Sequence, residues 1–309
     1  MVQNENTILI FSDIHADIAA LSTIFKCITS KEFEDRFNPV KKVINLGDVV
    51  GRGYSPGEVI EFIENLDYDV VSIIGNHDES VIYDWPISGD DFFASKIHDE
   101  FKQKKEHWDY FKDLKDFCID SEINLLCIHG GPIDPISITP SGLSDYERWF
   151  YKRTWQRIDP GKSYFNPYTG FRYTPEMAFE HAKNTLAKEI EEEVDNILIF
   201  AGHQHREAVY QKEGGEIRNI HALIKFNVNT ITCSYRALNF SEFVVEKDSS
   251  YLVRFGIAGP VGYGFYTSQF GVLYFDGDTK ETKIALLEVD YTKMAQEVLE
   301  GLRENYMSI

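Results

Sequence analysis

Five short polar clusters in the sequence combine the side chains that most often bind divalent metal ions. They are Asp13-Ile14-His15, Gly47-Asp48, Gly75-Asn76-His77-Asp78, His129-Gly130-Gly131 and Gly202-His203-Gln204-His205. Asp, Asn and His supply oxygen and nitrogen ligands for metals of intermediate hardness, such as manganese, iron, zinc or magnesium. Cysteine is absent from the clusters, which disfavours a structural zinc or an iron–sulfur site. The clusters therefore predict a site for catalytic metal ions.

The spacing within two of the clusters suits a shared site. Asp13 and His15 are two residues apart, and so are His203 and His205. On an extended chain, residues at this spacing point to the same side, so we expect each pair to reach one site together. Glycine beside the other ligand types suits tight turns and a close approach of the backbone.

Each cluster taken alone has an ordinary structural explanation. A lone histidine is more often structural or exposed than a ligand, and His-x-His can simply belong to a strand. The Gly-Asn-His-Asp segment can be a turn that starts a helix, because Asn is a good helix cap. The conjunction of five such clusters, each near the end of an apolar segment, favours the metal site.

The elements around the clusters predict how the side chains are positioned. Apolar runs at 7–11, 42–46 and 70–74 predict strands, and the spacing of apolar residues predicts helices over 14–28 and 56–66. This alternation implies parallel strands joined by right-handed crossovers. Ligands of such sheets gather at the carboxyl ends of the strands, which is where the clusters lie.

The remainder of the chain predicts further elements around one domain that spans residues 1–309. Strands are expected at 117–119, 124–128 and 196–200, and β-structure with hairpin turns at 213–216 and 276–278 follows. Helices are expected at 90–114, 144–158, 175–194 and 292–305. Residues 140–195 are expected to form a helical insertion or cap.

The charge of the chain limits its partners. The 50 acidic and 31 basic residues give a net charge of −19, which would repel a long nucleic acid. A small phosphorylated substrate is compatible with this charge, because bound cations invert the local sign in an acidic cleft. The net charge also has a plain explanation in solubility.

The sequence predicts no association with a membrane. It contains no apolar run of 18 residues, and its start lacks the basic and apolar regions of a signal peptide. The four cysteines form no C-x-x-C pair, and Cys27 and Cys127 lie in apolar runs. We therefore expect a cytoplasmic protein by default.

The ordered clusters resemble a known motif set. D-x-H, GD, GNHD, an H-G cluster and G-H-x-H, spread over most of residues 7–210, are typical of the calcineurin-like metallophosphoesterase superfamily. NLGDVVGRGYSPGEVIEFIE at 45–64, and GPVGYG at 259–264 followed by FGVLYFD, resemble its prokaryotic predicted-phosphoesterase branch. The resemblance implies an α/β (α+β) fold with two mixed β-sheets packed as a sandwich between two outer layers of helices.

The resemblance also implies two divalent metal ions, with manganese expected and iron, zinc, nickel or magnesium as alternatives. Ligands of the first metal would be Asp13, His15 and His205, those of the second Asn76, His129 and His203, and Asp48 would bridge both. His77 resembles the histidine that lies beside the phosphate without binding metal, and Asp78 would orient it. Asn76 and Arg52 are also expected to contact the substrate.

These features predict a metal-dependent phosphoesterase. Two cations roughly 3.5–4 Å apart clamp a phosphoryl group and turn a bridging water into a hydroxide nucleophile. An imidazole has the pKa range to protonate the leaving group, so His77 is expected to act as this acid or as a phosphate-stabilising donor. The expected substrate is small: a nucleotide, a dinucleoside polyphosphate or a phosphodiester.

Two departures from related motifs bear on the alternatives. Ser/Thr protein phosphatases have a second aspartate where this chain has Gly51, so activity as a protein phosphatase is disfavoured. Arg52 is retained and could hold a phosphate through its planar guanidinium, or could be an ordinary surface arginine. A non-catalytic scaffold is disfavoured, because His77 and every expected ligand are present.

The insertion leaves two interpretations open. Its first half interleaves Tyr146, Trp149, Phe150, Tyr151 and Trp155 with Arg148, Lys152, Arg153 and Arg157. This segment could cover the metal site, where it would stack a base or bind additional phosphates. Alternatively, its aromatic residues pack on the core or across a dimer interface, so the sequence leaves a homo-oligomer open.

Overall fold

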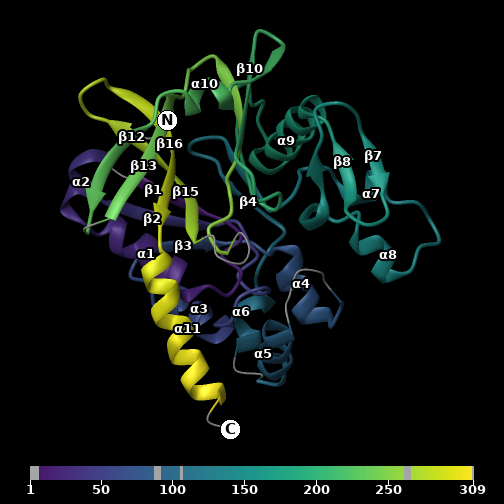
Figure 1. The fold of residues 1–309 in the computed structure, drawn as a ribbon. Coiled ribbons are helices and arrows are strands. Elements are labelled where there is room, and N and C mark those ends of the chain that lie inside the picture. The colour runs from purple at the N-terminus through teal and green to yellow at the C-terminus, as the bar shows by residue number, and fades with distance from the viewer. Residues whose placement is uncertain (1–6, 87–91, 105–106, 235, 261–265, 308–309) are drawn as a thin grey trace.

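The computed structural model describes residues 7–307, except 87–91, 105–106, 235 and 261–265. Within these residues, two large mixed β-sheets pack face to face, and helices cover their outer faces (Figure 1). This arrangement confirms the predicted four-layer sandwich. The glycine-rich segment at 259–264 lies mostly outside the described residues.

The first sheet contains the parallel strands that precede three of the polar clusters. Its order is β12 (Asn229–Cys233), β13 (Arg236–Val244), β16 (Glu281–Asp290), β15 (Thr267–Asp276), β1 (Thr7–Phe11), β2 (Val40–Asn45) and β3 (Asp69–Ser72). Strands β1, β2 and β3 are parallel, whereas β15 is antiparallel to β1. The carboxyl ends of β1, β2 and β3 therefore lie at one edge of this sheet.

The second sheet supplies the other two clusters. Its order is β11 (Glu216–Asn219), β10 (Ala208–Glu213), β14 (Ser249–Arg254), β9 (Leu198–Ala201), β5 (Leu125–Ile128) and β4 (Phe117–Asp120). Strands β5 and β9 are parallel neighbours, and the antiparallel hairpins β10–β11 and β15–β16 form where turns were predicted.

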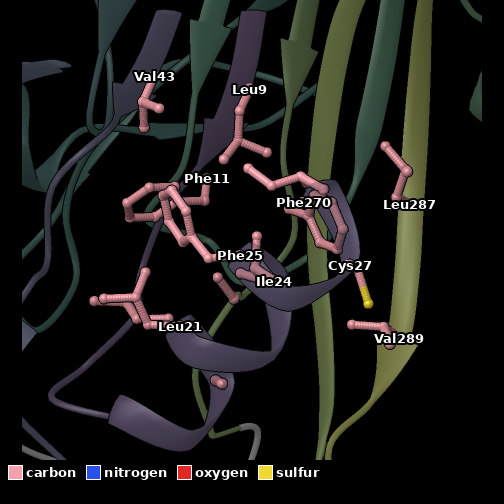
Figure 2. Packing of buried hydrophobic residues seen from close by; sticks show 14 of the residues in the cluster. Leu9, Phe11, Leu21, Ile24, Phe25, Cys27, Val43, Phe270, Leu287 and Val289 are labelled. Atoms are coloured by element: carbon pink, nitrogen blue, oxygen red, sulfur yellow. The ribbon is translucent and has the colours of Figure 1, made fainter. Parts of the chain in front are cut away.

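Successive side chains of β1 alternate between two hydrophobic cores. Leu9 and Phe11 point to the helices, whereas Ile8 and Ile10 point to the second sheet, because successive side chains of a strand face opposite ways. Figure 2 shows α1 (Ile18–Ile28) with its apolar face turned toward Leu9 and Phe11. Leu198 and Phe200 of β9 complete the core between the sheets.

The helices lie on both outer faces. Those associated with the first sheet are α1, α2 (Lys31–Phe37), α3 (Pro56–Glu64), α4 (Asn76–Tyr83), α5 (Phe92–Gln103), α6 (Trp108–Lys112) and α11 (Thr292–Met307); α10 (His221–Lys225) follows β11. Helix α9 (Pro175–Ile190) packs Ala178, Phe179 and Leu186 against the outer face of the second sheet. In the part of the chain that is described, no helix is long and apolar enough to span a bilayer.

The predicted helix over 144–158 is wrong. Only α8 (Asp145–Trp149) forms, followed by a 3₁₀ turn at Arg153–Trp155. The chain then enters a small sheet of β6 (Arg157–Ile158), β8 (Gly170–Tyr173) and β7 (Tyr164–Asn166), and a short helix α7 (Pro135–Ile138) precedes the insertion. Contacts of residues 153–156 with the core override helical propensity, so the insertion is not purely helical.

Other boundaries differ for local reasons. The predicted helix over 14–28 begins only at Ile18, because the side chain of Asp17 caps it by accepting a hydrogen bond from the Ala20 N–H. The stretch 90–114 forms α5 and α6 rather than one helix. Helices α2, α4 and α10 were not predicted, since each is short.

Candidate metal centre

The expected ligands come from five strand ends on two different sheets. Asp13 and His15 follow β1, Asp48 follows β2, and Asn76 follows β3. His129 follows β5, and His203 and His205 follow β9. The contacts described below bring these segments together, so the site lies where the carboxyl ends of both sheets meet.

The first group consists of Asp13, His15 and His205. His205 Nε2 lies 3.0 Å from Asp13 Oδ1 and 3.1 Å from His15 Nε2. His15 Nε2 is 3.8 Å from Asp13 Oδ1, and Asp13 and His15 are fully buried. One donor atom from each of the three residues lies within 4.8 Å of the others, which suits a single cation.

The second group consists of Asp48, His129 and His203, with Asn76 beside them. His129 Nε2 lies 3.3 Å from Asp48 Oδ2 and 3.2 Å from Asn76 Oδ1. The donor atoms of Asp48, His129 and His203 also lie within 4.8 Å of one another. Asp48 Oδ2 is in addition 3.9 Å from His15 Nε2, so this carboxylate lies between the two groups.

The hydrogen bonds of the histidine rings leave Nε2 directed at the site. His15 Nδ1 lies 3.3 Å from the Val50 carbonyl oxygen, and His129 Nδ1 lies 2.7 Å from that of Leu46. A carbonyl can only accept, so both Nδ1 atoms carry a proton, and in the neutral rings both Nε2 atoms have a lone pair for a metal. His203 Nε2 is buried without a hydrogen-bond partner among the described residues, as expected for a ligand atom.

The buried charges at this site call for a cation. Burial alone would raise the pKa of the Asp48 carboxyl, but His129 and His77 outweigh burial and hold that pKa well below its usual range. Burial likewise lowers the pKa of His129, yet Asp48 and Asp13 outweigh it and raise this pKa to about 9. A proton on His129 thus balances the carboxylates of the metal-free protein, and a divalent cation can replace it.

The backbone is left-handed rather than extended at five of the seven expected ligands. Asp13, His15, Asp48, His203 and His205 have φ angles of 56°, 49°, 57°, 66° and 56°. The expectation that Asp-x-His and His-x-His converge because they are extended is therefore wrong, although the side chains do converge. Non-glycine residues seldom adopt this conformation, and clusters of it mark sites where the surrounding structure imposes strain for function.

His77 lies beside the first group of ligands and against Gly51. Its ring packs edge-on to that of His15, with 4.6 Å between centroids, and a ring nitrogen lies within 4.8 Å of donor atoms of His15 and Asp48. A Cβ at Gly51 would be only 2.2 Å from His77 Nδ1. The Gly51 N–H donates to Nε2 of the buried His98 at 2.9 Å, a residue that sequence reasoning missed because it lies far away on α5.

Asp78 holds the backbone of the loop after β2. Its Oδ1 accepts from the N–H groups of Val49 and Val50 at 2.9 and 3.2 Å. Its Oδ2 accepts from those of Asp48 and Gly75, both at 2.9 Å. These four bonds give Asp78 a direct part in placing Asp48, whereas its expected role of orienting His77 stays a prediction.

Arg52 lies at the exposed side of the first group. One of its guanidinium nitrogens, Nη1, lies 3.4 Å from His205 Nδ1, and the residue is half-buried with a φ of 62°. The sequence could not decide between a site residue and a surface arginine, and this contact brings Arg52 to the ligand cluster.

The insertion is hydrogen-bonded to Glu79 of α4, two residues after His77. The buried carboxylate of Glu79 accepts from the Trp149 indole at 2.7 Å, from Lys152 Nζ at 2.7 Å and from the Thr154 hydroxyl at 2.8 Å. Trp149 and Trp155 are themselves buried. Much of the aromatic segment therefore packs into the protein, as one of the two interpretations expected.

We expect Glu79→Gln to loosen the insertion without removing a metal ligand. The variant loses the ion pair with Lys152 and places an amide N–H against donors, at an expected cost of about 1–3 kcal/mol in the free energy of unfolding. Urea titration would measure this loss, and hydrogen exchange would locate it at residues 145–158. Glu180→Gln, at an exposed position of α9, is the matched control and should change neither. Equal stability of the two variants would contradict this role of Glu79.

The fold and the ligand types at its strand ends agree with a match to a known family. The sequence pattern described as Calcineurin-like phosphoesterase matches residues 7–207, well over half of the chain. The chain belongs to the calcineurin-like phosphoesterase family.

Two solved structures share the fold, and one further relative is similar in sequence over part of the chain. The structure is similar to a metallophosphoesterase from Sphaerobacter thermophilus, with a TM-score of 0.50 and 19% identity over 93% of this chain and 89% of that one. It is also similar to the hypothetical protein PH1004 from Pyrococcus horikoshii, with a TM-score of 0.50 and 16% identity over 96% and 94%. An uncharacterised protein of Methanocaldococcus jannaschii is 35% identical over 78 residues, which span 25% of this chain and 28% of that protein.

Proposed function

We propose that this protein hydrolyses small phosphorylated molecules with two divalent cations held by the two ligand groups. The observation that carries the proposal is the position of Asp48, whose Oδ2 is 3.9 Å from His15 Nε2 in one group and 3.3 Å from His129 Nε2 in the other. A carboxylate has two oxygens and one negative charge, so it suits a position between two cations. Asp13, His15 and His205 would complete the first site, and Asn76, His129 and His203 the second.

The cations would supply an activated water and neutralise the charge on a phosphoryl group. The side chains of the chain itself have separate tasks. Arg52 would donate N–H groups to a phosphate oxygen, and the contact of its guanidinium with His205 supports this role. His77 would donate a proton toward the leaving oxygen, and the distance of 4.6 Å between its ring and that of His15 supports this role.

Asp78 contributes by holding geometry rather than by contacting substrate. Its carboxylate fixes the N–H groups of Asp48, Val49 and Val50, and the Asp48 side chain in turn accepts from the His77 N–H at 2.8 Å. The expected bridging ligand and the expected proton donor are thus linked in one hydrogen-bonded unit. Such preorganisation is what a reaction driven by positioning requires.

The test is a metal-dependence assay. Protein from which a chelator has removed all metal should hydrolyse none of four substrates: bis(p-nitrophenyl) phosphate, p-nitrophenyl phosphate, mononucleotides and dinucleoside polyphosphates. Adding manganese, iron, zinc, nickel or magnesium should restore turnover with at least one substrate, and about two equivalents of metal should bind. Turnover that survives complete removal of metal would overturn the proposal. Preferential turnover of a phosphopeptide would instead favour a protein phosphatase.

A further inference from the structure

Two arginines of the insertion lie side by side in its small sheet. Arg157 of β6 and Arg172 of β8 are directly paired in the register of the small sheet. Among the described residues, neither forms an ion pair with an acidic side chain. Like charges placed opposite each other on neighbouring strands destabilise a sheet, so this pairing needs an explanation.

One residue positions both guanidinium groups. The Thr169 carbonyl accepts from Arg157 Nε at 3.0 Å, and the Thr169 hydroxyl accepts from Arg172 Nη2 at 3.3 Å. Arg172 Nε is buried and has no hydrogen-bond partner in the described part of the chain. The pair is therefore held in place by one bond each, and both side chains are only half-buried, so their other guanidinium N–H groups remain for an external acceptor.

The strand that carries Arg157 is attached to the loop of the metal ligands. The Gln204 side chain, between His203 and His205, accepts from the Ile158 N–H at 2.8 Å and donates to the Ile158 carbonyl at 3.3 Å. Trp155, two residues before Arg157, packs its ring edge-on to that of His203 at 5.8 Å. These contacts on both sides of Arg157 fix its backbone relative to the loop that carries His203 and His205.

A second attachment fixes the same segment from the loop after β5. The Gly131 N–H donates to the Arg153 carbonyl at 2.9 Å, and the fully buried Gln156 bonds both the N–H and the carbonyl of Ile133 at 3.0 and 2.8 Å. Two ligand-bearing loops therefore hold the segment that ends at Arg157. This placement is rigid, as a substrate-binding group requires.

The charges around Arg157 agree with a position close to the metal centre. Burial and the neighbouring charge of Arg172 lower the pKa of Arg157 to about 10, while Asp13 and Asp48 oppose this shift. Arg157 remains cationic near neutral pH, so a positive group adjoins the metal ligands.

We propose that Arg157 and Arg172 form a binding site for a second phosphate, which makes substrates with two or more linked phosphates the preferred class. The inference rests on the proposed function, because it assigns one phosphate to the metal centre and the next to the arginine pair. Two adjacent guanidiniums match the closely spaced oxygens of a di- or triphosphate chain. Nucleoside di- and triphosphates, dinucleoside polyphosphates and inorganic polyphosphates share this chemistry, whereas p-nitrophenyl phosphate has nothing to occupy the pair.

Binding is tested first, on the metal-free protein in EDTA with inorganic tripolyphosphate as the probe. EDTA keeps cations away from the ligand cluster, so the part of a rise in the melting temperature that depends on Arg157 and Arg172 reports the arginine pair. Arg157→Gln, Arg172→Gln and the double variant should abolish this rise. Arg148→Gln, at an exposed position of the same insertion, is the control and should retain it. An unchanged rise in the double variant would overturn the site.

Kinetics of the metal-loaded protein supply the second readout. For a substrate with linked phosphates, each single variant should raise KM by roughly ten- to a hundred-fold, the value of one charged hydrogen-bonded contact. The KM for p-nitrophenyl phosphate should not change. Removing one of two like charges should leave the unliganded protein as stable or more stable, whereas a purely structural role of Arg157 predicts a loss of stability with both substrates affected equally, which would contradict the proposal.

The two readouts separate the two proposals. A protein that binds tripolyphosphate through the pair but hydrolyses nothing would confirm the anion site and contradict the proposed function. Metal-dependent hydrolysis in which the double variant treats all substrates like the unmodified protein would overturn the anion site alone.

Discussion

Asp48→Asn is expected to reduce turnover by at least about a hundred-fold, because Asn removes the negative charge that lies between the two ligand groups. Asn keeps the size of the side chain and an oxygen that can accept from the His77 N–H, as Asp48 Oδ1 does at 2.8 Å. The loss should therefore come from metal binding and not from misfolding. Steady-state kinetics with manganese and metal analysis of the purified variant measure it.

Stability gives an independent check on the same variant. A cation at a hundred times its dissociation constant stabilises a folded protein by about 2.7 kcal/mol. Manganese should raise the melting temperature of the unmodified protein clearly, and that of Asp48→Asn much less. Asp17→Asn is the control, because this side chain caps α1, Asn caps equally well, and neither ligand group contains it. Full turnover of Asp48→Asn would contradict the central position of this carboxylate.

Gly51→Ala is expected to have the second largest effect, through His77. Gly51 has a φ of +89°, and a Cβ there would lie 2.2 Å from His77 Nδ1, so the imidazole must move. A displacement of about 1 Å in a group near the reaction can reduce turnover roughly a hundred-fold. Kinetics should show this loss in kcat, while metal analysis should show that the cations remain bound.

Gly142→Ala isolates the steric effect from the backbone effect. Gly142 has a φ of +84°, close to that of Gly51, but a Cβ there would meet nothing within 4 Å. Both variants should lose roughly 1–2 kcal/mol from the left-handed backbone, measured by urea unfolding. Only Gly51→Ala should lose turnover, and equal activity of the two would show that the contact with His77 is unimportant.

Much of the fold could be predicted from the sequence because its cores follow simple periods. The apolar runs that become β1, β5 and β9 are short and continuous, and a motif of metal-ligand types marks the carboxyl end of each. The start of the first helix shows where prediction from apolar periodicity fails. The apolar spacing extends through Ile14, but the cap at Asp17 starts the helix four residues later.

The rest depended on contacts between distant segments, which local patterns do not contain. The aromatic segment at 144–158 has the residue types of a helix, yet Glu79, Gly131 and Gln204 bond it in other conformations. The same holds for the small sheet that pairs Arg157 with Arg172, since the sequence offered Arg157 only as one of four basic residues. His98 accepts from the Gly51 N–H although the two residues are 47 positions apart, and no local motif predicts this contact.

The origin of the ligands in two sheets has a mechanical consequence. His15 and His205 are 190 residues apart in sequence and approach within 3.1 Å. A cation that binds both would act as a cross-link that closes a very long loop of the unfolded chain, and longer loops gain more from closure. Removing the cation with a chelator would thus weaken the connection between the two sheets at this edge, while the hydrogen bonds within each sheet remain.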